Sequence, residues 1–459
     1  QVPQVASSVK RTAPSNAVVI SAATHRLVKS YFSCEPLAPN LEGTASQIYR
    51  VVEEAEAELG DSSDGRMPAL IGREAESAML LERFADLQAG NGHVVLLTGE
   101  AGIGKSSLLR FFRRSIEQEK TTWLEARCSP YFDSTALHPI IELLKKLAGF
   151  GDDDSPETKL AKLRAFLVTN DAGREGFALL SSLLSLPLPA VAELNLSPHR
   201  QKQKTLEAIT TLLLGMTARQ PVVLVIDDLH WVDPSTLELV SSLIDEGPSA
   251  GIMLVLTARN EFSSPWGGRG HISQITLSRL TKKRIEALAL HITGGKALPD
   301  EVMRELVAKT DGVPLFVEEL TKNVLEQSFI EDKGTHYALR KPLPPLGIPG
   351  TLRDSLTSRL DRLGSAKTTA QLCATLGRDF EYPLLRSIST QTDEDLERDL
   401  KTLVEGELLY QRGTPPRAKY SFKHSLVQET AYESLLKNAR RQAHSRIANV
   451  LAESQPELC

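Results

Sequence analysis

The sequence has too few cysteines, too widely spaced, for a metal cluster or a disulfide scaffold. Its 459 residues include four cysteines, Cys34, Cys128, Cys373 and Cys459, and none of them forms a Cys-x-x-Cys pair. Zinc sites and small secreted domains need closely spaced cysteines. We therefore expect reduced thiols and a cytoplasmic protein without a signal peptide. The start at Gln1 predicts a piece of a longer chain.

The sequence also lacks a long apolar run and a strong charge of either sign. No window reaches the about 18 uninterrupted apolar residues of a membrane span, and the richest run, residues 177–192, is broken by prolines and serines. The formal net charge is −5, which gives no overall attraction to nucleic acid or anionic lipid. These absences predict no membrane association and argue against nucleic acid as a partner.

What is present is an alternation of apolar strands and amphipathic helices in the middle of the chain. This alternation predicts an α/β fold with a parallel sheet that is covered on both faces. The expected strands are residues 93–99, 121–128, 221–229, 252–259 and 272–278.

The remaining segments predict a modular chain around this sheet. The expected parts before the sheet are a small α/β segment (1–59), with strands at 16–21 and 46–53, and a linker (60–68). The domain that contains the sheet (69–278) is followed by a helical lid (279–340), an all-α or winged-helix domain (341–440) and the start of a helical, repeat-like region (441–459). A hairpin around residues 413–416, after several short helices, is the basis for the winged helix.

A glycine-rich turn with the pattern Gly-x-x-x-x-Gly-Lys-Ser follows the first strand of the sheet. Its glycines permit positive φ and a close backbone approach, so that successive N–H groups and the following helix start can hold phosphates. Lys105 is expected to reach the β- and γ-phosphates, and the Ser106 hydroxyl to bind Mg²⁺. The turn predicts that residues 69–278 form a P-loop NTPase domain. The predicted nucleotide-binding residues of this turn are Gly99, Glu100, Ala101, Gly102, Ile103, Gly104, Lys105, Ser106 and Ser107.

Polar residues also end two later apolar strands. Asp227 and Asp228 come directly after the apolar residues of one of these strands. Because an unpaired buried charge costs several kcal/mol, two carboxylates at this place indicate a functional role. We assign Asp227 to Mg²⁺ and Asp228 to the attacking water; capping of the next helix is the alternative. Arg259 ends the next strand and is expected to sense the γ-phosphate, with pairing to a local carboxylate as the alternative. His230 either lines this site or is an exposed loop residue.

These motifs resemble the STAND class of signal-transduction ATPases, in particular those fused to bacterial class III nucleotidyl cyclases and soluble adenylyl cyclase. The order and spacing of the motifs agree as well as the residues, over 69 to about 440. The segments that carry the resemblance are residues 70–76 (LIGREAE), 99–106 (GEAGIGKS), 224–236 (LVIDDLHWVDPST), 310–320 (TDGVPLFVEEL) and 422–436 (FKHSLVQETAYESLL).

The resemblance implies further site residues outside the glycine-rich turn. Gly72 and Arg73 are expected to lie against the nucleotide. Gly312 and Pro314 correspond to the Gly-x-Pro of the lid, with the proline against the adenine. His424 corresponds to a winged-helix histidine that contacts the β-phosphate of ADP; packing on its own hairpin is the alternative.

The first 60 residues resemble the end of a class III cyclase catalytic domain. Where that family has a catalytic Asn and Arg, this chain has Gln4 and Ser8. A serine cannot supply the guanidinium that stabilises the transition state. The chain alone is therefore not expected to make cyclic nucleotide, although a two-residue shift in register would bring Lys10, which is followed by Arg11, to the cationic position.

The predicted function is an ATP-binding, slowly hydrolysing switch that uses ATP or ADP with Mg²⁺. The C-terminal helical region is expected to bind protein partners, and a homo-oligomer is compatible with the pattern. One alternative is the regulatory part of a class III adenylate cyclase. A DNA-binding regulator is another, which the acidic segment 394–408 disfavours, because recognition helices meet phosphates with Lys and Arg. A replication-initiator ATPase is a related alternative that would need a basic wing, and residues 411–420 carry only modest positive charge.

Overall fold

The computed structural model describes most of the chain beyond residue 69. The described residues are 18–21, 32–37, 48–54, 70–130, 132–151, 154–170, 173–187, 196–247, 250–267, 269–326, 330–340 and 351–454. The chain divides into two compact units, which we describe separately. Met67–Leu352 is the sheet unit, and Gln1–Arg66 together with Arg353–Cys459 is the helical unit.

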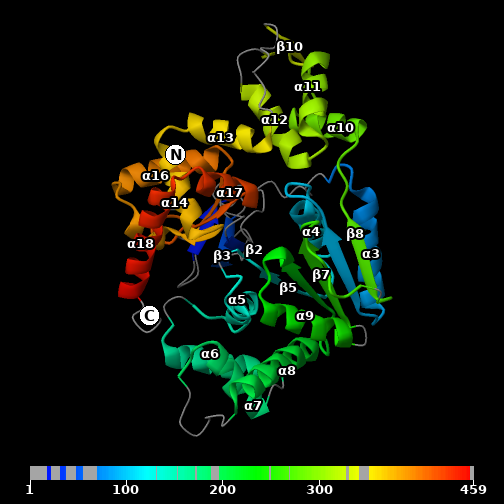
Figure 1. The fold of residues 1–459 in the computed structure, drawn as a ribbon, viewed down its shortest axis with the longest axis vertical. Helices are drawn as coiled ribbons and strands as arrows, with labels where there is room; N and C mark the ends of the chain where they lie inside the picture. The colour runs from blue at the N-terminus through cyan, green and yellow to red at the C-terminus, as the bar shows by residue number, and fades with distance from the viewer. Residues whose placement is uncertain are drawn as a thin grey trace. The chain divides into compact units, whose positions relative to one another are not determined.

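A five-stranded parallel sheet lies at the centre of the sheet unit (Figure 1). Its strand order is β5-β6-β7-β4-β8, and every neighbouring pair is parallel. The strands are β4 (His93–Thr98), β5 (Thr122–Arg127), β6 (Val222–Asp227), β7 (Ile252–Ala258) and β8 (Ile272–Thr276). The five strands expected from the sequence and the α/β fold class are confirmed.

Helices bury both faces of this sheet, which is why its central strands are apolar throughout. Successive side chains of a strand point to opposite faces, and Val94 accordingly packs in one apolar cluster and Val95 in another. The Val95 face is covered by α3 (Glu74–Gln88) and α4 (Lys105–Ser115). The Val94 face is covered by α5 (His138–Leu147), α6 (Pro156–Thr169), α7 (Gly173–Leu183), α8 (Pro198–Met216) and α9 (Pro234–Glu246).

Three helices on the Val94 face begin with a capping side chain followed by proline. Ser155, Ser197 and Asp233 each accept backbone N–H groups from the first turn of α6, α8 and α9, respectively. Such caps satisfy donors that have no partner within the helix, and proline suits the first helical position because its missing N–H is not needed there. The local sequence therefore fixes where these helices start.

The lid expected at residues 279–340 consists of three helices and a hairpin. The helices are α10 (Lys282–Ile292), α11 (Asp300–Thr310) and α12 (Pro314–Glu326), which share an apolar core around Leu306, Phe316 and Leu320. The short strands β9 (Ile330–Asp332) and β10 (Tyr337–Leu339) pair antiparallel. The sequence predicted only helices here, because three-residue strands are too short to show an alternating pattern.

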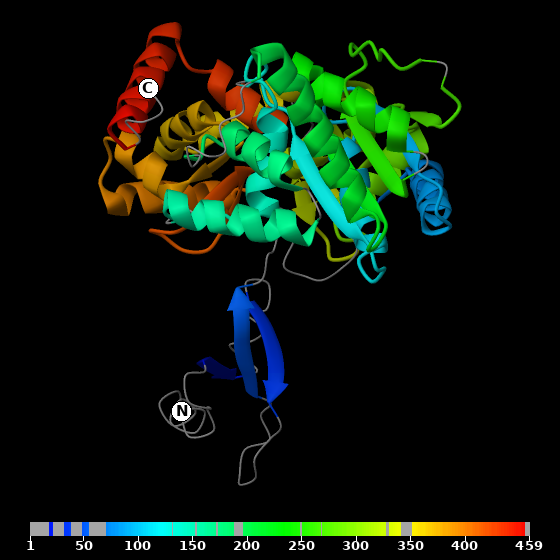
Figure 2. The same ribbon diagram turned by 90° about the horizontal axis from the view of Figure 1, so that it is seen from below.

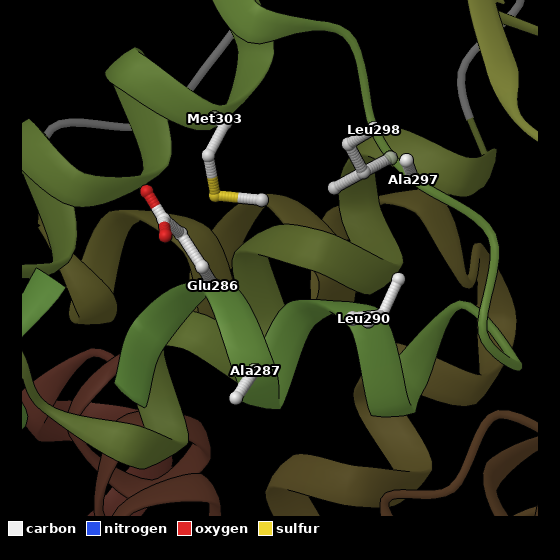
Figure 3. Close-up of a pocket in the computed structure, with 6 residues that line it drawn as sticks. All are labelled: Glu286, Ala287, Leu290, Ala297, Leu298 and Met303. Atoms are coloured by element: carbon white, nitrogen blue, oxygen red, sulfur yellow. The ribbon is translucent and has the colours of Figure 1, made fainter. Parts of the chain in front are cut away.

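A small apolar pocket lies between α10 and α11 (Figure 3). Its lining comes from α10, from the connection that follows and from the start of α11. The lining residues are Glu286, Ala287, Leu290, Ala297, Leu298 and Met303. None of these residues belongs to the predicted nucleotide site, so the pocket contributes nothing to it.

Gly312 at the start of the lid helix α12 is a position where only glycine fits. Its φ is +77°, and an added Cβ would lie 2.5 Å from the backbone oxygen of Leu280. The Leu280 N–H donates to the Gly312 oxygen at 2.7 Å, which keeps the two segments together. The close approach therefore connects the end of the sheet to α12.

Replacing Gly312 with alanine is expected to destabilise the sheet unit by about 2–5 kcal/mol. The left-handed conformation costs a side chain about 1–2 kcal/mol, and the backbone clash adds about 1–3 kcal/mol. Gly334→Ala is the matched control, because Gly334 has φ +87° but nothing within 4 Å of an added Cβ. Thermal unfolding measures both; equal losses in the two variants would contradict the close approach.

The helical unit begins with a three-stranded antiparallel sheet, drawn in blue in Figure 2. Its strands are β1 (Val18–Ser21), β2 (Phe32–Leu37) and β3 (Ile48–Glu54), in the order β1-β3-β2. The strands expected at 16–21 and 46–53 are confirmed, whereas β2 was not predicted. The linker 60–68 and the positions Gln4, Ser8, Lys10 and Arg11 lie outside the described residues, so their comparison with a cyclase stays a prediction.

The rest of the helical unit combines helices with a second antiparallel sheet. The hairpin expected around residues 413–416 is confirmed, and a third strand extends it in the order β11-β13-β12. The elements are α13 (Leu352–Arg362), α14 (Ser365–Leu376), β11 (Asp379–Glu381), α15 (Tyr382–Ile388), α16 (Asp393–Glu405), β12 (Leu409–Arg412), β13 (Lys419–Phe422), α17 (Ser425–Glu433) and α18 (Lys437–Ser454). Its assignment as a winged helix stays a prediction.

Membrane crossing has no structural basis in the part of the chain that is described. None of the helices there has both the length and the apolar character that a bilayer crossing requires.

Candidate nucleotide-binding site

The glycine-rich turn joins the end of β4 to the start of α4, as the sequence predicted. Gly102 and Gly104 have φ of +76° and +104°, the left-handed region that side chains disfavour. At Gly99 an added Cβ would lie 2.7 Å from Cγ2 of Ile103. The backbone therefore turns tightly and leads into a helix N-terminus, where unpaired N–H groups and the helix dipole attract anions.

Lys105 opens α4 and lies over this turn. Its Nζ donates to the backbone oxygens of Gly99 at 2.7 Å and Glu100 at 3.0 Å. Burial lowers the pKa of Lys105, while the nearby Asp228 and Asp227 act in the opposite direction. A cation held between the turn and two carboxylates is suited to bind phosphate.

The strand order brings the predicted acidic and basic residues to one edge of the sheet. Because β7 lies between β4 and β6, Arg259 follows the strand that separates the glycine-rich turn from Asp227. Asp227 is 3% exposed and accepts a hydrogen bond from the Thr257 hydroxyl. The Asp228 N–H donates to the same hydroxyl at 2.9 Å. In parallel sheets this carboxyl-end edge is where ligands bind.

Asp228 belongs to the acidic loop, residues 228–233, between β6 and α9, and Arg259 lies close to this loop. Asp228 has φ +61° and no side-chain capping bond, and Asp233 is the residue that caps α9. Helix capping therefore does not account for the acid pair. The Arg259 guanidinium lies 5.0 Å from the ring centroid of Trp231, a cation–π distance, so the aromatic ring holds Arg259 beside this loop.

Arg127 is a charged residue at this edge that the sequence analysis missed. It ends β5 directly opposite Asp227 in the strand register, and its Nε lies 3.4 Å from the Asp227 carboxylate. The signal was available, because Arg127 is the second-last residue of the strand predicted at 121–128, much as Arg259 is the last residue of the strand predicted at 252–259. Only the neighbouring position of β5 and β6 shows that the two charges pair.

His230 lines the site rather than being exposed. Its side chain is 10% exposed, and within the described chain neither ring nitrogen has a hydrogen-bond partner. Burial, together with Arg259 and Lys105, lowers the pKa of His230 to about 4. Buried polar atoms are normally paired, so these nitrogens fit a site that is completed by a polar ligand or by water.

The neutral His230 predicts a specific loss of stability in acid. The pKa of a histidine in the unfolded chain is near 6.5, so the unfolded chain binds a proton more readily than the folded one. The contribution of neutral His230 to the free energy of unfolding is therefore complete above about pH 6.5 and is lost as the pH falls toward 4. Between about pH 7.5 and pH 5 wild type should lose up to about 2 kcal/mol more than His230→Gln. Thermal unfolding at both pH values tests this, with the exposed His336→Gln as control; parallel losses in wild type and His230→Gln would contradict it.

The oxygen donors at this edge suit Mg²⁺. Ser106 lies at the start of α4 and Asp227 at the end of β6, and Mg²⁺ prefers one or two carboxylates together with phosphate and water oxygens. No group of three or more His, Cys, Asp or Glu that could hold a metal occurs among the residues described. One hydroxyl and one carboxylate suit an ion whose remaining ligands are phosphate and water oxygens.

The lid begins directly on the glycine-rich turn. The Leu315 N–H in the first turn of α12 donates to the Gly102 oxygen at 3.2 Å. Arg279 pairs with Glu100 of the turn at 2.9 Å and also with Asp311. Pro314 is the first residue of α12, beside these contacts.

The remaining predicted contacts lie in different places. Gly72 packs against α10, since an added Cβ would lie 2.7 Å from Arg284. Arg73 is buried beneath the turn and donates to the Ile103 oxygen at 3.0 Å. His424 directly precedes α17 in the helical unit, and its contact with a nucleotide stays a prediction.

Residues 69–256 match the family model of the AAA ATPase domain. The match spans the glycine-rich turn, the acidic strand end and the strands between them. Together with the parallel sheet and the geometry at its edge, it defines this part of the chain as a P-loop ATPase domain.

Two curated relatives extend the comparison along the chain. An uncharacterized protein of Rhizobium meliloti (strain 1021) is 27% identical over 451 residues, which are 97% of this chain and 43% of that protein. Adenylate cyclase type 10 of Mus musculus is 26% identical over 153 residues, 32% of this chain and 9% of that protein. The chain thus spans less than half the length of either relative.

Two solved structures resemble the chain at low similarity. One is a signal transduction ATPase with numerous domains (STAND) with a tetratricopeptide repeat sensor from Pyrococcus horikoshii, at TM-score 0.46 and 17% identity, covering 85% of this chain and 46% of that one. The other is Drosophila ORC bound to DNA, at TM-score 0.37 and 12% identity, covering 87% of this chain and 97% of that one.

Proposed function

We propose that the chain is a STAND-type ATPase that acts as a nucleotide-dependent conformational switch. The observation that carries this proposal is the hydrogen bond from Leu315 of the lid to Gly102 of the phosphate-binding turn. Because the turn and the lid share this bond, a phosphate that reshapes the turn also changes how the lid is held. A ligand shifts such an equilibrium only through its different affinity for the two states.

Each residue at the edge of the sheet has a defined role in this proposal. Lys105 and the N-terminus of α4 hold the phosphates, and Ser106 with Asp227 hold Mg²⁺, which would neutralise phosphate charge when bound. Asp228 orients the water, and Arg259 recognises the γ-phosphate. Slow hydrolysis suits a switch, since the lifetime of the ATP state sets the duration of the signal.

The nucleotide content of the purified protein and the hydrogen exchange of the lid test this proposal. Purified protein is expected to contain ADP or to bind it tightly, with slow turnover of ATP. Hydrogen exchange of the segment 311–316 should differ between ADP and a non-hydrolysable ATP analogue, since the Leu315 N–H in this segment donates to the Gly102 oxygen of the turn. Identical exchange in all nucleotide states, with binding intact, would leave an ATPase that is not a switch.

Regulation of a cyclase is the second proposal, favoured by the similarity to adenylate cyclase type 10. In a longer chain the ATPase part would regulate cyclic nucleotide synthesis, and protein partners or further copies would contact the C-terminal helices. Cyclic AMP production by the present chain is not expected. Measuring it beside ATP hydrolysis separates the two activities.

A further inference from the structure

Arg73 is a buried arginine whose guanidinium joins three separate segments of the sheet unit. It is 2% exposed. Its Nη2 donates to the Ile103 oxygen in the glycine-rich turn at 3.0 Å and to the Ser278 oxygen at 2.7 Å. Its Nη1 donates to the Glu76 carboxylate at 3.1 Å. These partners lie 30, 205 and 3 residues away along the chain.

The two backbone partners connect the phosphate-binding turn with the segment that leads to the lid. Ile103 precedes Gly104 at the start of α4, and its side chain is buried as well. Ser278 follows β8 and lies just before Arg279, which pairs with Glu100 of the turn. The planar guanidinium fork fixes two carbonyls in one plane, which a flexible ammonium does not. Glu76 supplies the opposite charge that a buried cation needs.

We propose that Arg73 is a positioning residue that sets the shape of the phosphate-binding turn and does not itself touch the nucleotide. Both Nη2 hydrogens are directed to protein carbonyls, and the side chain is buried, so the adenine or guanine base of a nucleotide could contact Nη2 only by displacing those bonds. The proposal deepens the proposed function and rests on it. Its consequence is that Arg73 contributes equally to the affinity for every ligand that has phosphate groups, whether or not the ligand carries a base.

Three ligands and two variants test this consequence. Arg73→Met keeps the length of the side chain but removes all donors, and Arg73→Lys keeps the charge but loses the fork. Arg83→Met is the matched control, since Arg83 lies on α3, the helix that Arg73 directly precedes, and pairs with Asp86. Calorimetric affinities for ADP, GDP and pyrophosphate are measured for wild type and each variant, with circular dichroism to confirm folding.

Arg73→Met is expected to lower the affinity for all three ligands by the same factor, about 10-fold to 100-fold. A loss of this size is expected when groups that bind a ligand are displaced slightly from their positions. Arg73→Lys should lower these affinities by a smaller common factor, and this variant decides the question if Arg73→Met does not fold. A loss confined to ADP would overturn the proposal, because it would show contact with adenine, and so would unchanged affinities. Wild type that binds none of the three ligands would contradict the proposed function instead.

Discussion

Replacing Lys105 with methionine is expected to weaken ATP binding and hydrolysis by about 100-fold to 1,000-fold, the range for removing one preorganised electrostatic group. The side chain contributes a cation that lies over the turn, with its Nζ hydrogen-bonded to the Gly99 and Glu100 oxygens. Methionine fills similar volume without charge or donors. Titration with a fluorescent ATP analogue and a phosphate-release assay measure the two losses.

Lys120→Met is the matched control for this substitution. Lys120 is exposed beyond the end of α4, so its replacement removes a positive charge without changing the turn. Its affinity should stay within about twofold of wild type, because an exposed charge at a distance is screened. If Lys105→Met bound ATP as tightly as this control, the turn would not be the phosphate site.

Replacing Asp228 with asparagine is expected to separate ATP binding from hydrolysis. The carboxylate is assigned to the attacking water, so its loss should slow hydrolysis by about 100-fold to 10,000-fold, as for other positioned acid–base groups. Binding should change little, because Asp227 and Lys105 remain. Asparagine preserves the shape, and the Asp228 N–H keeps its bond to Thr257. Single-turnover hydrolysis beside equilibrium binding measures the two effects.

Asp227→Asn should behave differently from Asp228→Asn. Asp227 is buried beside Thr257 and Arg127, and it is the assigned Mg²⁺ ligand. We expect its replacement to raise the Mg²⁺ concentration needed for binding as well as to slow hydrolysis. The exposed Asp245→Asn serves as the control for loss of one acidic residue in the same domain. Equal effects of the Asp227 and Asp228 substitutions would remove the distinction between metal ligand and water-orienting group.

Local patterns predicted the elements whose formation depends on neighbouring residues. The strand before the glycine-rich turn and the strand that ends at Asp227 are buried on both faces. Their sequences are therefore nearly continuous apolar runs, which is the pattern typical of central strands in a parallel sheet. The turn itself was predicted from the Gly-x-x-x-x-Gly-Lys-Ser pattern, and in the structure Gly102 and Gly104 have the positive φ that glycine permits. The lid hairpin at 330–339 and the strand β2 were missed because short strands carry too little pattern.

The partners of the buried charges could not be predicted, because they come from distant parts of the chain. Arg127 meets Asp227 only because β5 and β6 are neighbours in the sheet. Arg73 was expected against the nucleotide; in the structure its guanidinium donates to two backbone carbonyls 30 and 205 residues away as well as to the nearby Glu76 carboxylate. Sequence spacing carries no information on such pairings.

The sequence by itself determined that this chain has a parallel α/β sheet with a phosphate-binding turn and an acidic strand end, since periodicity and glycine placement act over a few residues. Only the tertiary structure decided the strand order that brings Arg259, Asp227 and the turn to one edge. It also decided that Gly312 lies against Leu280 and that the lid starts on the turn. These features depend on which distant segments pack together, and packing is a property of the whole folded unit.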